Sequence, residues 1–302
     1  MPLTPAHAVA VVPFCRWKPY LWLSPLVIGS MAPDFAYFVF LPEPLRHIGH
    51  TPLGLLYFCI PAGLAVLYAF HRFFKQPLVL LLPRQVRAKL RPFCGPFPLL
   101  PVRRLVWISA LILLGAVTHV VWDGFTHDDG WAVREFPLLT AVITIAGLKF
   151  YCFGFLQYAS SGLGLGLLVW WSWQWYRRAP SGYVPADSAF LRRARPAIVA
   201  AMITFGTGVG IICALAHVRH LPGGFDPREF LAAAFITGVD AFGLALLVFV
   251  ATVNLGVGTA ATGMTAKRRS ADQFLLLRDL SSSVGHAAHE SDAADPVIAL
   301  EQ

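Results

Sequence analysis

Residues 118–127 place His119, Asp123 and His127 four positions apart. On an α-helix each such step turns about 40° around the axis, so the three side chains project from one face. Two imidazoles and one carboxylate are ligands that a divalent metal ion such as Zn²⁺ binds. The spacing therefore predicts a metal or catalytic site at the end of the apolar run that begins near Leu105. The alternative is a polar helix end that faces water.

Two further candidate ligands lie nearer the N-terminus, beside apolar segments. Asp34 follows Pro33 within residues 21–41, a segment long enough to cross a bilayer. An ionisable residue at membrane depth is a candidate for function, although Asp34 could instead cap a helix that restarts after Pro33. His50 lies in the polar connection that precedes the apolar segment 52–70.

The composition of the 302-residue chain is that of an integral membrane protein. Hydrophobic residues make up 57% of the sequence and charged residues 13%, about half the charged fraction of a typical soluble domain. Several apolar runs approach the length of a transmembrane helix. We therefore predict an all-α fold, a polytopic transmembrane bundle of about six spans in which short re-entrant helices could also occur.

The distribution of basic residues predicts the orientation of this bundle. The formal net charge of +8 comes largely from short loops, with eight Lys or Arg in residues 71–104 and five Arg in 177–195. This placement indicates cytoplasmic loops and argues against a nucleic-acid partner. We expect residues 1–262 to form the transmembrane domain with both termini in the cytoplasm, and 263–302 to be a polar, disordered tail.

In this topology the apolar run that begins near Leu105 crosses outward, so its three candidate ligands reach the outer face together with His50. His7 is the exception. Residues 4–14 are apolar but too short to span, and they start on the cytoplasmic side if 21–41 crosses outward. His7 can join the other ligands only if the first forty residues form a re-entrant helical hairpin that enters from outside.

Four stretches of the sequence are familiar: MPLTPAHA, LVIGSMAPDF, HTPLG and THVVWDGFTHDDGW. Together they resemble a bacterial membrane family catalogued as domain-of-unknown-function family 4184, over about the first 175 residues. In the stretch LQYASS, Tyr158 stands where the family's pattern has histidine, which argues against an essential ligand at that position. The resemblance implies a location in the bacterial inner membrane.

The motif layout of this family is in turn similar to that of inner-membrane metal-dependent hydrolases. Through them it distantly resembles the zinc-dependent phospholipase C and nuclease group. That group builds a multi-zinc site with additional His and Glu ligands, and residues 1–262 of this sequence have no matching HxxxE pattern. Any metal site in this chain is therefore expected to be smaller.

These observations favour a membrane-embedded metal-dependent hydrolase that acts on an amphipathic ester or phosphoester, such as a membrane lipid, at the outer face. A bound Zn²⁺ would lower the pKa of a water molecule, and Asp34 would be the general base because burial raises the pKa of a carboxyl group. The expected metal ligands are His7, His50, His119, Asp123 and His127.

The alternative function is that of a non-catalytic membrane protein, such as a transporter or an assembly factor. The His/Asp cluster would then bind a metal ion or a proton structurally. Asp240, an isolated carboxylate within the apolar segment 230–253, would mark a polar path together with Asp34, or it could accept hydrogen bonds from neighbouring helices. A catalytic metal site keeps an open coordination position, whereas a structural site is closed.

Overall fold

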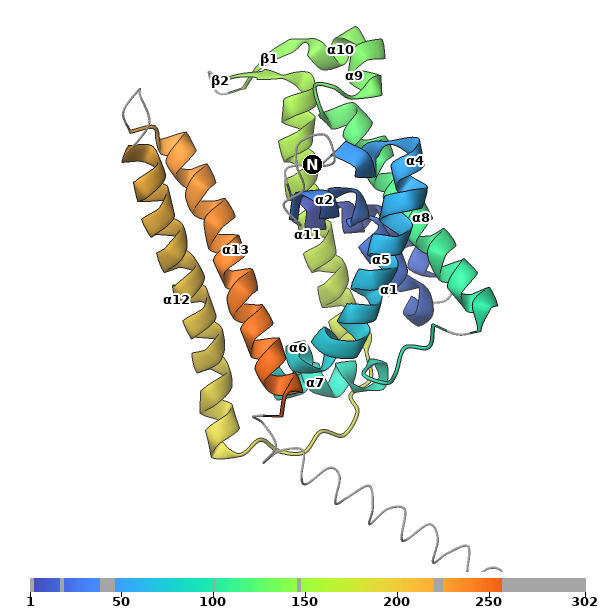
Figure 1. The fold of residues 1–302 in the computed structure, drawn as a ribbon, viewed down its shortest axis with the longest axis vertical. Coiled ribbons are helices and arrows are strands. Elements are labelled where there is room, and N and C mark those ends of the chain that lie inside the picture. Colours follow the sequence, from blue (N-terminus) through green and yellow to red (C-terminus); the bar gives the residue numbers. More distant parts are fainter. Residues whose placement is uncertain are drawn as a thin grey trace, which may run out of the picture. The chain divides into compact units, whose positions relative to one another are not determined.

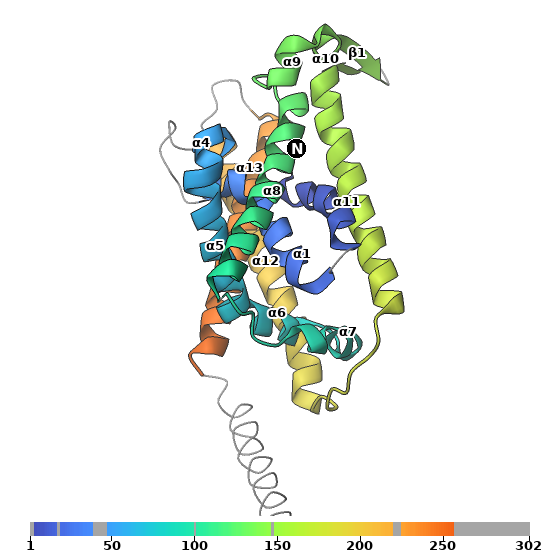
Figure 2. The same ribbon diagram turned by 90° about the vertical axis from the view of Figure 1, so that its right-hand side faces the viewer.

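The computed structural model describes residues 3–16, 19–38, 47–99, 101–145, 148–219 and 225–256. Helices dominate these residues, which confirms the predicted all-α fold (Figures 1 and 2). The chain divides into two compact units, Met1–Ala201 and Met202–Gln302, and each is described by itself below. The predicted tail 263–302 lies outside the described residues.

Five helices in the described part of the chain are long and apolar enough to cross a membrane, which indicates membrane insertion. The expected number was about six, and the difference arises near the N-terminus. The five candidate spans are Pro52–Leu81, Val102–Glu135, Cys152–Arg178, Ala189–Arg219 and Glu229–Asn254.

The segment 21–41, expected to be the first span, does not form one continuous helix. Helix α1 (Pro19–Gly29) is followed by a turn and then by the 3₁₀-helix η2 (Ala32–Asp34) and the short helix α2 (Phe35–Phe38). Pro33 has no N–H with which to continue the hydrogen bonds of α1. The 11 residues of α1 extend about 16 Å, roughly half the hydrocarbon thickness of a bilayer.

Unit 1 packs these short N-terminal helices against long ones. The 3₁₀-helix η1 (Thr4–Arg16) contacts α1, α8 (Val102–Thr126) and α11 (Cys152–Arg178). Helix α1 crosses α8 at a glycine, because a Cβ atom at Gly115 would overlap the backbone of Leu26 and Ser30. Leu26 and Ile112 are fully buried near this crossing. The close approach brings the backbone of Ser30 to α8, one turn before His119.

The first candidate span is a continuous helix with two wider, π-helical turns. It consists of α4 (Pro52–Gly54), η4 (Leu55–Cys59), α5 (Ile60–Ala69), η5 (Phe70–Phe74) and α6 (Lys75–Leu81). Each π-helical turn precedes a proline, Pro61 or Pro77, whose missing N–H the wider turn accommodates. The 3₁₀-helix η3 (His47–His50) lies immediately before this span.

Short elements connect the long helices of unit 1. Helix α7 (Arg84–Leu90) and η6 (Arg91–Phe93) follow the first span. After α8 come α9 (Trp131–Glu135), α10 (Pro137–Thr140) and an antiparallel hairpin of β1 (Val142–Ile145) and β2 (Leu148–Tyr151), in which Val142 pairs with Tyr151.

Two arginines form ion pairs with Asp187, in the connection before α12 (Ala189–Arg219), and link this connection to α7. Arg87 Nη2 donates to Asp187 Oδ1 over 2.5 Å, and Arg195 donates to both oxygens of the same carboxylate. The hydrogen bonds from Arg195 and Arg87 outweigh burial and lower the pKa of Asp187 to about 2. The network therefore links the two basic loops that the sequence analysis placed on one side of the membrane.

Replacing this carboxylate should destabilise unit 1. We expect Asp187→Asn to lower the free energy of unfolding by about 1.5–3 kcal/mol, the range for hydrogen bonds to charged groups. Because the pKa is lowered in the folded state, the carboxylate stabilises the fold above about pH 4 and loses this effect as the pH falls toward 2. Thermal unfolding in detergent at pH 7 measures the change, with the exposed Asp129→Asn as control. Equal melting temperatures for Asp187→Asn and wild type would contradict the assignment.

Unit 2 contains α13 (Pro227–Asn254) packed against the part of α12 that follows Ala201. The two helices approach closely at small residues, with Gly206 facing Gly238, a common arrangement in membrane bundles. Asp240 lies on α13 with an exposed side chain. Both roles considered for Asp240 stay predictions.

Candidate metal centre

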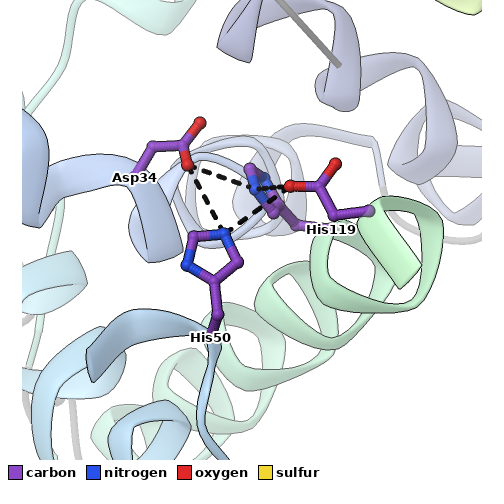
Figure 3. Close-up of side chains that lie close together, drawn as sticks. Asp34, His50 and His119 are labelled. Atoms are coloured by element: carbon purple, nitrogen blue, oxygen red, sulfur yellow. Dashed lines mark ion pairs between the residues drawn. The ribbon is translucent and has the colours of Figure 1, made fainter. Parts of the chain in front are cut away.

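Three elements of unit 1 bring four of the predicted site residues together. Asp34 ends η2, His50 ends η3, and His119 and Asp123 lie one turn apart on α8. One ligand atom from each residue lies within 4.8 Å of the other three (Figure 3). We call these four residues the metal-ligand group, since such a group could hold a metal ion.

The spacing of the ligand atoms suits a small ion. His119 Nε2 lies 3.0 Å from Asp123 Oδ2 and 3.4 Å from Asp34 Oδ1. His50 Nε2 lies 3.6 Å from each of the same two oxygens. Four ligands arranged tetrahedrally at about 2.0–2.1 Å from a zinc ion are about 3.3 Å apart. The group therefore needs only small side-chain movements to bind an ion of this size.

The orientation of His119 is fixed from the side opposite the carboxylates. Its Nδ1 lies 2.7 Å from the carbonyl oxygen of Ser30. A carbonyl can only accept, so Nδ1 carries a proton and donates it. Metal-ligating histidines almost always make such a hydrogen bond with the second ring nitrogen. His119 Nε2 is thereby turned toward the two carboxylates, where it is buried without a hydrogen-bond partner among the described residues.

Asp34 is oriented in a similar way. Thr4 Oγ1 donates to Asp34 Oδ2 over 2.7 Å, which leaves Oδ1 to face His50 and His119. No sequence pattern predicted a role in the site for Thr4 or Ser30. Ser30 acts through its backbone, which residue type cannot reveal. The role of the Thr4 hydroxyl could have been predicted only if the N-terminal segment had been expected to pack against Asp34.

His7 lies on η1 directly behind His119. The two rings stack with centroids 3.7 Å apart and planes inclined by 16°. His7 Nε2 is 3.4 Å from Asp123 Oδ1, the carboxylate oxygen that does not face His119. Burial, followed by the electrostatic effect of the neighbouring His119 imidazole, lowers the pKa of His7 to about 3. His7 therefore reaches the site because the N-terminal residues fold back as short helices. It contacts Asp123 but does not itself belong to the metal-ligand group.

His127 lies at the exposed edge of the site. Helix α8 ends at Thr126, and His127 has extended backbone dihedral angles, so its side chain leaves the helical face that carries His119 and Asp123. His127 Nε2 is 3.6 Å from Asp123 Oδ2 and 3.4 Å from Gln157 Nε2 on α11. Its side chain is 40% exposed, whereas that of His119 is fully buried. Gln157 is a neighbour of the site that the sequence analysis did not single out.

The expectation that burial leaves Asp34 with a raised pKa is wrong. Burial does favour the protonated form, but the neighbouring His119 imidazole and the hydrogen bond from Thr4 outweigh it and lower the pKa of Asp34. Both carboxylate oxygens are also engaged, one by Thr4 and one by the histidines. The choice of Asp34 as general base therefore loses its physical reason.

Comparison with family models identifies the family of the chain. The family described as domain of unknown function (DUF4184) matches residues 1–254. The chain belongs to this family. The DUF4184 match extends beyond the first 175 residues to the end of the last candidate span, Glu229–Asn254. Comparisons with curated proteins and with solved structures gave no match.

Proposed function

We propose that this DUF4184 protein is a membrane-embedded, metal-dependent hydrolase, with a zinc-like ion bound by the metal-ligand group. The observation that carries the proposal is the buried Nε2 of His119. It faces two carboxylate oxygens while Nδ1 is held by the carbonyl of Ser30. With Nδ1 donating to Ser30, a neutral His119 turns the lone pair of Nε2 toward these two carboxylate oxygens, and a metal ion would bind all three atoms. Nitrogen and oxygen donors in this combination suit Zn²⁺.

A catalytic ion must also be reachable by water and substrate. The side chains of His50 and His127 are 24% and 40% exposed, so one edge of the group meets the surface. There the ion would lower the pKa of a bound water toward 7 and polarise an ester or phosphoester bond. This exposed edge supports catalysis over a closed structural site, the feature expected of a non-catalytic protein.

The order of the helices supports a position at the outer face of a bacterial inner membrane. His50 lies just before the start of the first candidate span. Asp123 lies near the end of α8, the long helix of the second candidate span. The group therefore lies at the ends of these two helices opposite the basic residues 71–104, which the positive-inside rule assigns to the cytoplasm. A lipid-like, amphipathic ester or phosphoester is the substrate that reaches such a position.

Five crossings change the expected placement of the termini. Because α1, η2 and α2 replace the first expected span, the proposed topology puts η1 on the outer side with the metal-ligand group and the end of α13 on the cytoplasmic side. Single cysteines introduced at the exposed positions Pro5 and Asp129 and at the half-buried Lys89, in a variant without the native cysteines, test this topology. We expect a membrane-impermeant thiol reagent outside the cell to label the positions at Pro5 and Asp129 only. Labelling at Lys89 alone would contradict the topology.

Gly49→Ala should weaken metal binding without removing a ligand. A Cβ atom at Gly49 would overlap the carbonyl of Pro33, so η3 must move away from η2 and His50 from Asp34. We expect a 10–100-fold lower metal affinity, the range for losing a group that orients a ligand. Competition with a zinc-binding dye measures the affinity. Gly162→Ala is the matched control, since nothing lies within 4 Å of the added Cβ, and equal affinities for the two variants would contradict the geometry.

Hydrolysis can be tested with the purified protein in liposomes. Bis(p-nitrophenyl) phosphate and p-nitrophenyl butyrate are general probes for phosphodiester and carboxylic ester hydrolysis. We expect a chelator to abolish release of p-nitrophenol from at least one probe, and added Zn²⁺ to restore it. A protein that binds zinc in the metal-ligand group but hydrolyses neither these probes nor phospholipids would favour the non-catalytic alternative.

A further inference from the structure

The carboxylate of Asp123 lies between two histidine rings that face it in parallel. His119 Nε2 is 3.0 Å from Oδ2, and His7 Nε2 is 3.4 Å from Oδ1. Because the rings are stacked and nearly parallel, the two nitrogens direct their lone pairs side by side at the two oxygens of one carboxylate. A single ion cannot lie on both lone-pair directions.

We propose that Asp123 bridges two metal ions, the ion of the metal-ligand group and a second ion bound by His7 Nε2 and Asp123 Oδ1. This inference rests on the proposed metal centre and extends it. The ring separation of 3.7 Å matches the spacing of about 3.5–4 Å between the ions of two-metal sites. It also departs from the single, smaller site that the sequence predicted.

The surroundings of His7 support a second ion over an ordinary hydrogen bond. Its side chain is 2% exposed, and Nε2 has no hydrogen-bond partner among the described residues. The 3.4 Å separation from Asp123 Oδ1 is longer than a normal N–H···O bond of about 2.7–3.2 Å. It equals the separation of His119 Nε2 from Asp34 Oδ1 within the metal-ligand group, as expected for two ligands of one ion.

The second ion has few protein ligands among the described residues. Thr4 lies one 3₁₀ turn before His7, so both side chains share a face of η1. The hydroxyl of Thr4 is already engaged by Asp34. Among the described residues, His7 and Asp123 are therefore the protein ligands of this ion, and water or substrate would take the remaining positions.

A two-metal centre favours a phosphoester as the substrate, because paired ions can stabilise both the attacking and the leaving oxygen of an in-line displacement. In that reaction the oxygen of a metal-bound water forms a bond to phosphorus and the ester P–O bond breaks. The proton of the water passes to the departing alkoxide. An activated water between the ions also removes the need for Asp34 as general base.

The number of bound ions tests this inference. Purified protein is stripped with a chelator, reloaded with Zn²⁺ in excess, freed of unbound metal, and analysed for metal per chain. We expect about two ions in wild type and in the exposed control His217→Ala, and about one in His7→Ala and His7→Gln. In Mn²⁺-loaded protein, electron paramagnetic resonance should show a magnetically coupled pair in wild type and an uncoupled ion in His7→Gln.

The outcomes separate this inference from the proposed function. One ion in wild type, with no Mn²⁺ coupling, overturns the second site but keeps the metal-ligand group. No bound ion in wild type overturns both. The wild-type count decides the question even if a His7 variant fails to fold.

Discussion

His119→Ala is expected to abolish metal binding while the protein remains folded in the membrane. His119 is fully buried and contacts both carboxylates of the metal-ligand group. Its removal takes away one ligand and leaves Asp34 and Asp123 facing each other across an empty space. We expect at least about a 10³-fold loss of zinc affinity, since losing a group that only orients a ligand already costs 10–100-fold. Isothermal titration with Zn²⁺ measures this loss.

His47→Ala is the matched control for this substitution. His47 lies on η3 three residues before His50, outside the metal-ligand group, and its ring contacts Tyr37. We expect wild-type affinity in this variant. The assignment fails if His119→Ala, folded as judged by circular dichroism and gel filtration, binds zinc as tightly as His47→Ala does.

Metal removal is expected to cause the second large effect, a loss of stability centred on the N-terminal helices. The metal-ligand group joins η2, η3 and α8, and η1 contributes Thr4 and His7 to its surroundings. A ligand present at a thousand times its dissociation constant stabilises the folded state by about 4 kcal/mol. We therefore expect a chelator to lower the melting temperature and to expose residues 3–16 to protease.

The stabilisation by zinc should depend on pH in a defined direction. The imidazoles must be neutral to bind a metal ion, so protons compete as the pH falls through about 6.5, the ordinary pKa of histidine. The difference in melting temperature between zinc-loaded and chelator-treated protein should be large at pH 8 and small at pH 5. A constant difference, or none at pH 8, would contradict metal binding by histidines.

The sequence was informative where function depends on side chains at fixed helical spacing. His119 and Asp123 share one face of α8 because four residues complete slightly more than one turn. The same spacing predicted that His127 shares this face, but α8 ends at Thr126. Helical periodicity alone does not predict where a helix ends. Helix ends depend on tertiary contacts, such as the packing of Trp131 against Gly124.

The N-terminal region shows what hydropathy alone cannot predict. Residues 21–41 are apolar enough to span, and hydropathy does not register the break after Gly29, where Pro33 lacks the N–H that a continuing helix would need. That break brings Asp34 and His7 into one site and exposes the carbonyl of Ser30 to His119. Ser30 acts through its backbone, so its role follows from the crossing of α1 with α8 and not from its identity.

X-ray absorption of the zinc-loaded protein tests the central claim most directly. The account predicts a first shell of nitrogen and oxygen atoms at about 2.0–2.1 Å, with the outer-shell scattering typical of imidazole. His119→Ala should lose the bound zinc, whereas the control Asp129→Asn should give the wild-type spectrum. A sulfur shell at about 2.3 Å, which would place the ion at cysteines, or a wild-type protein that retains no zinc, would contradict the account.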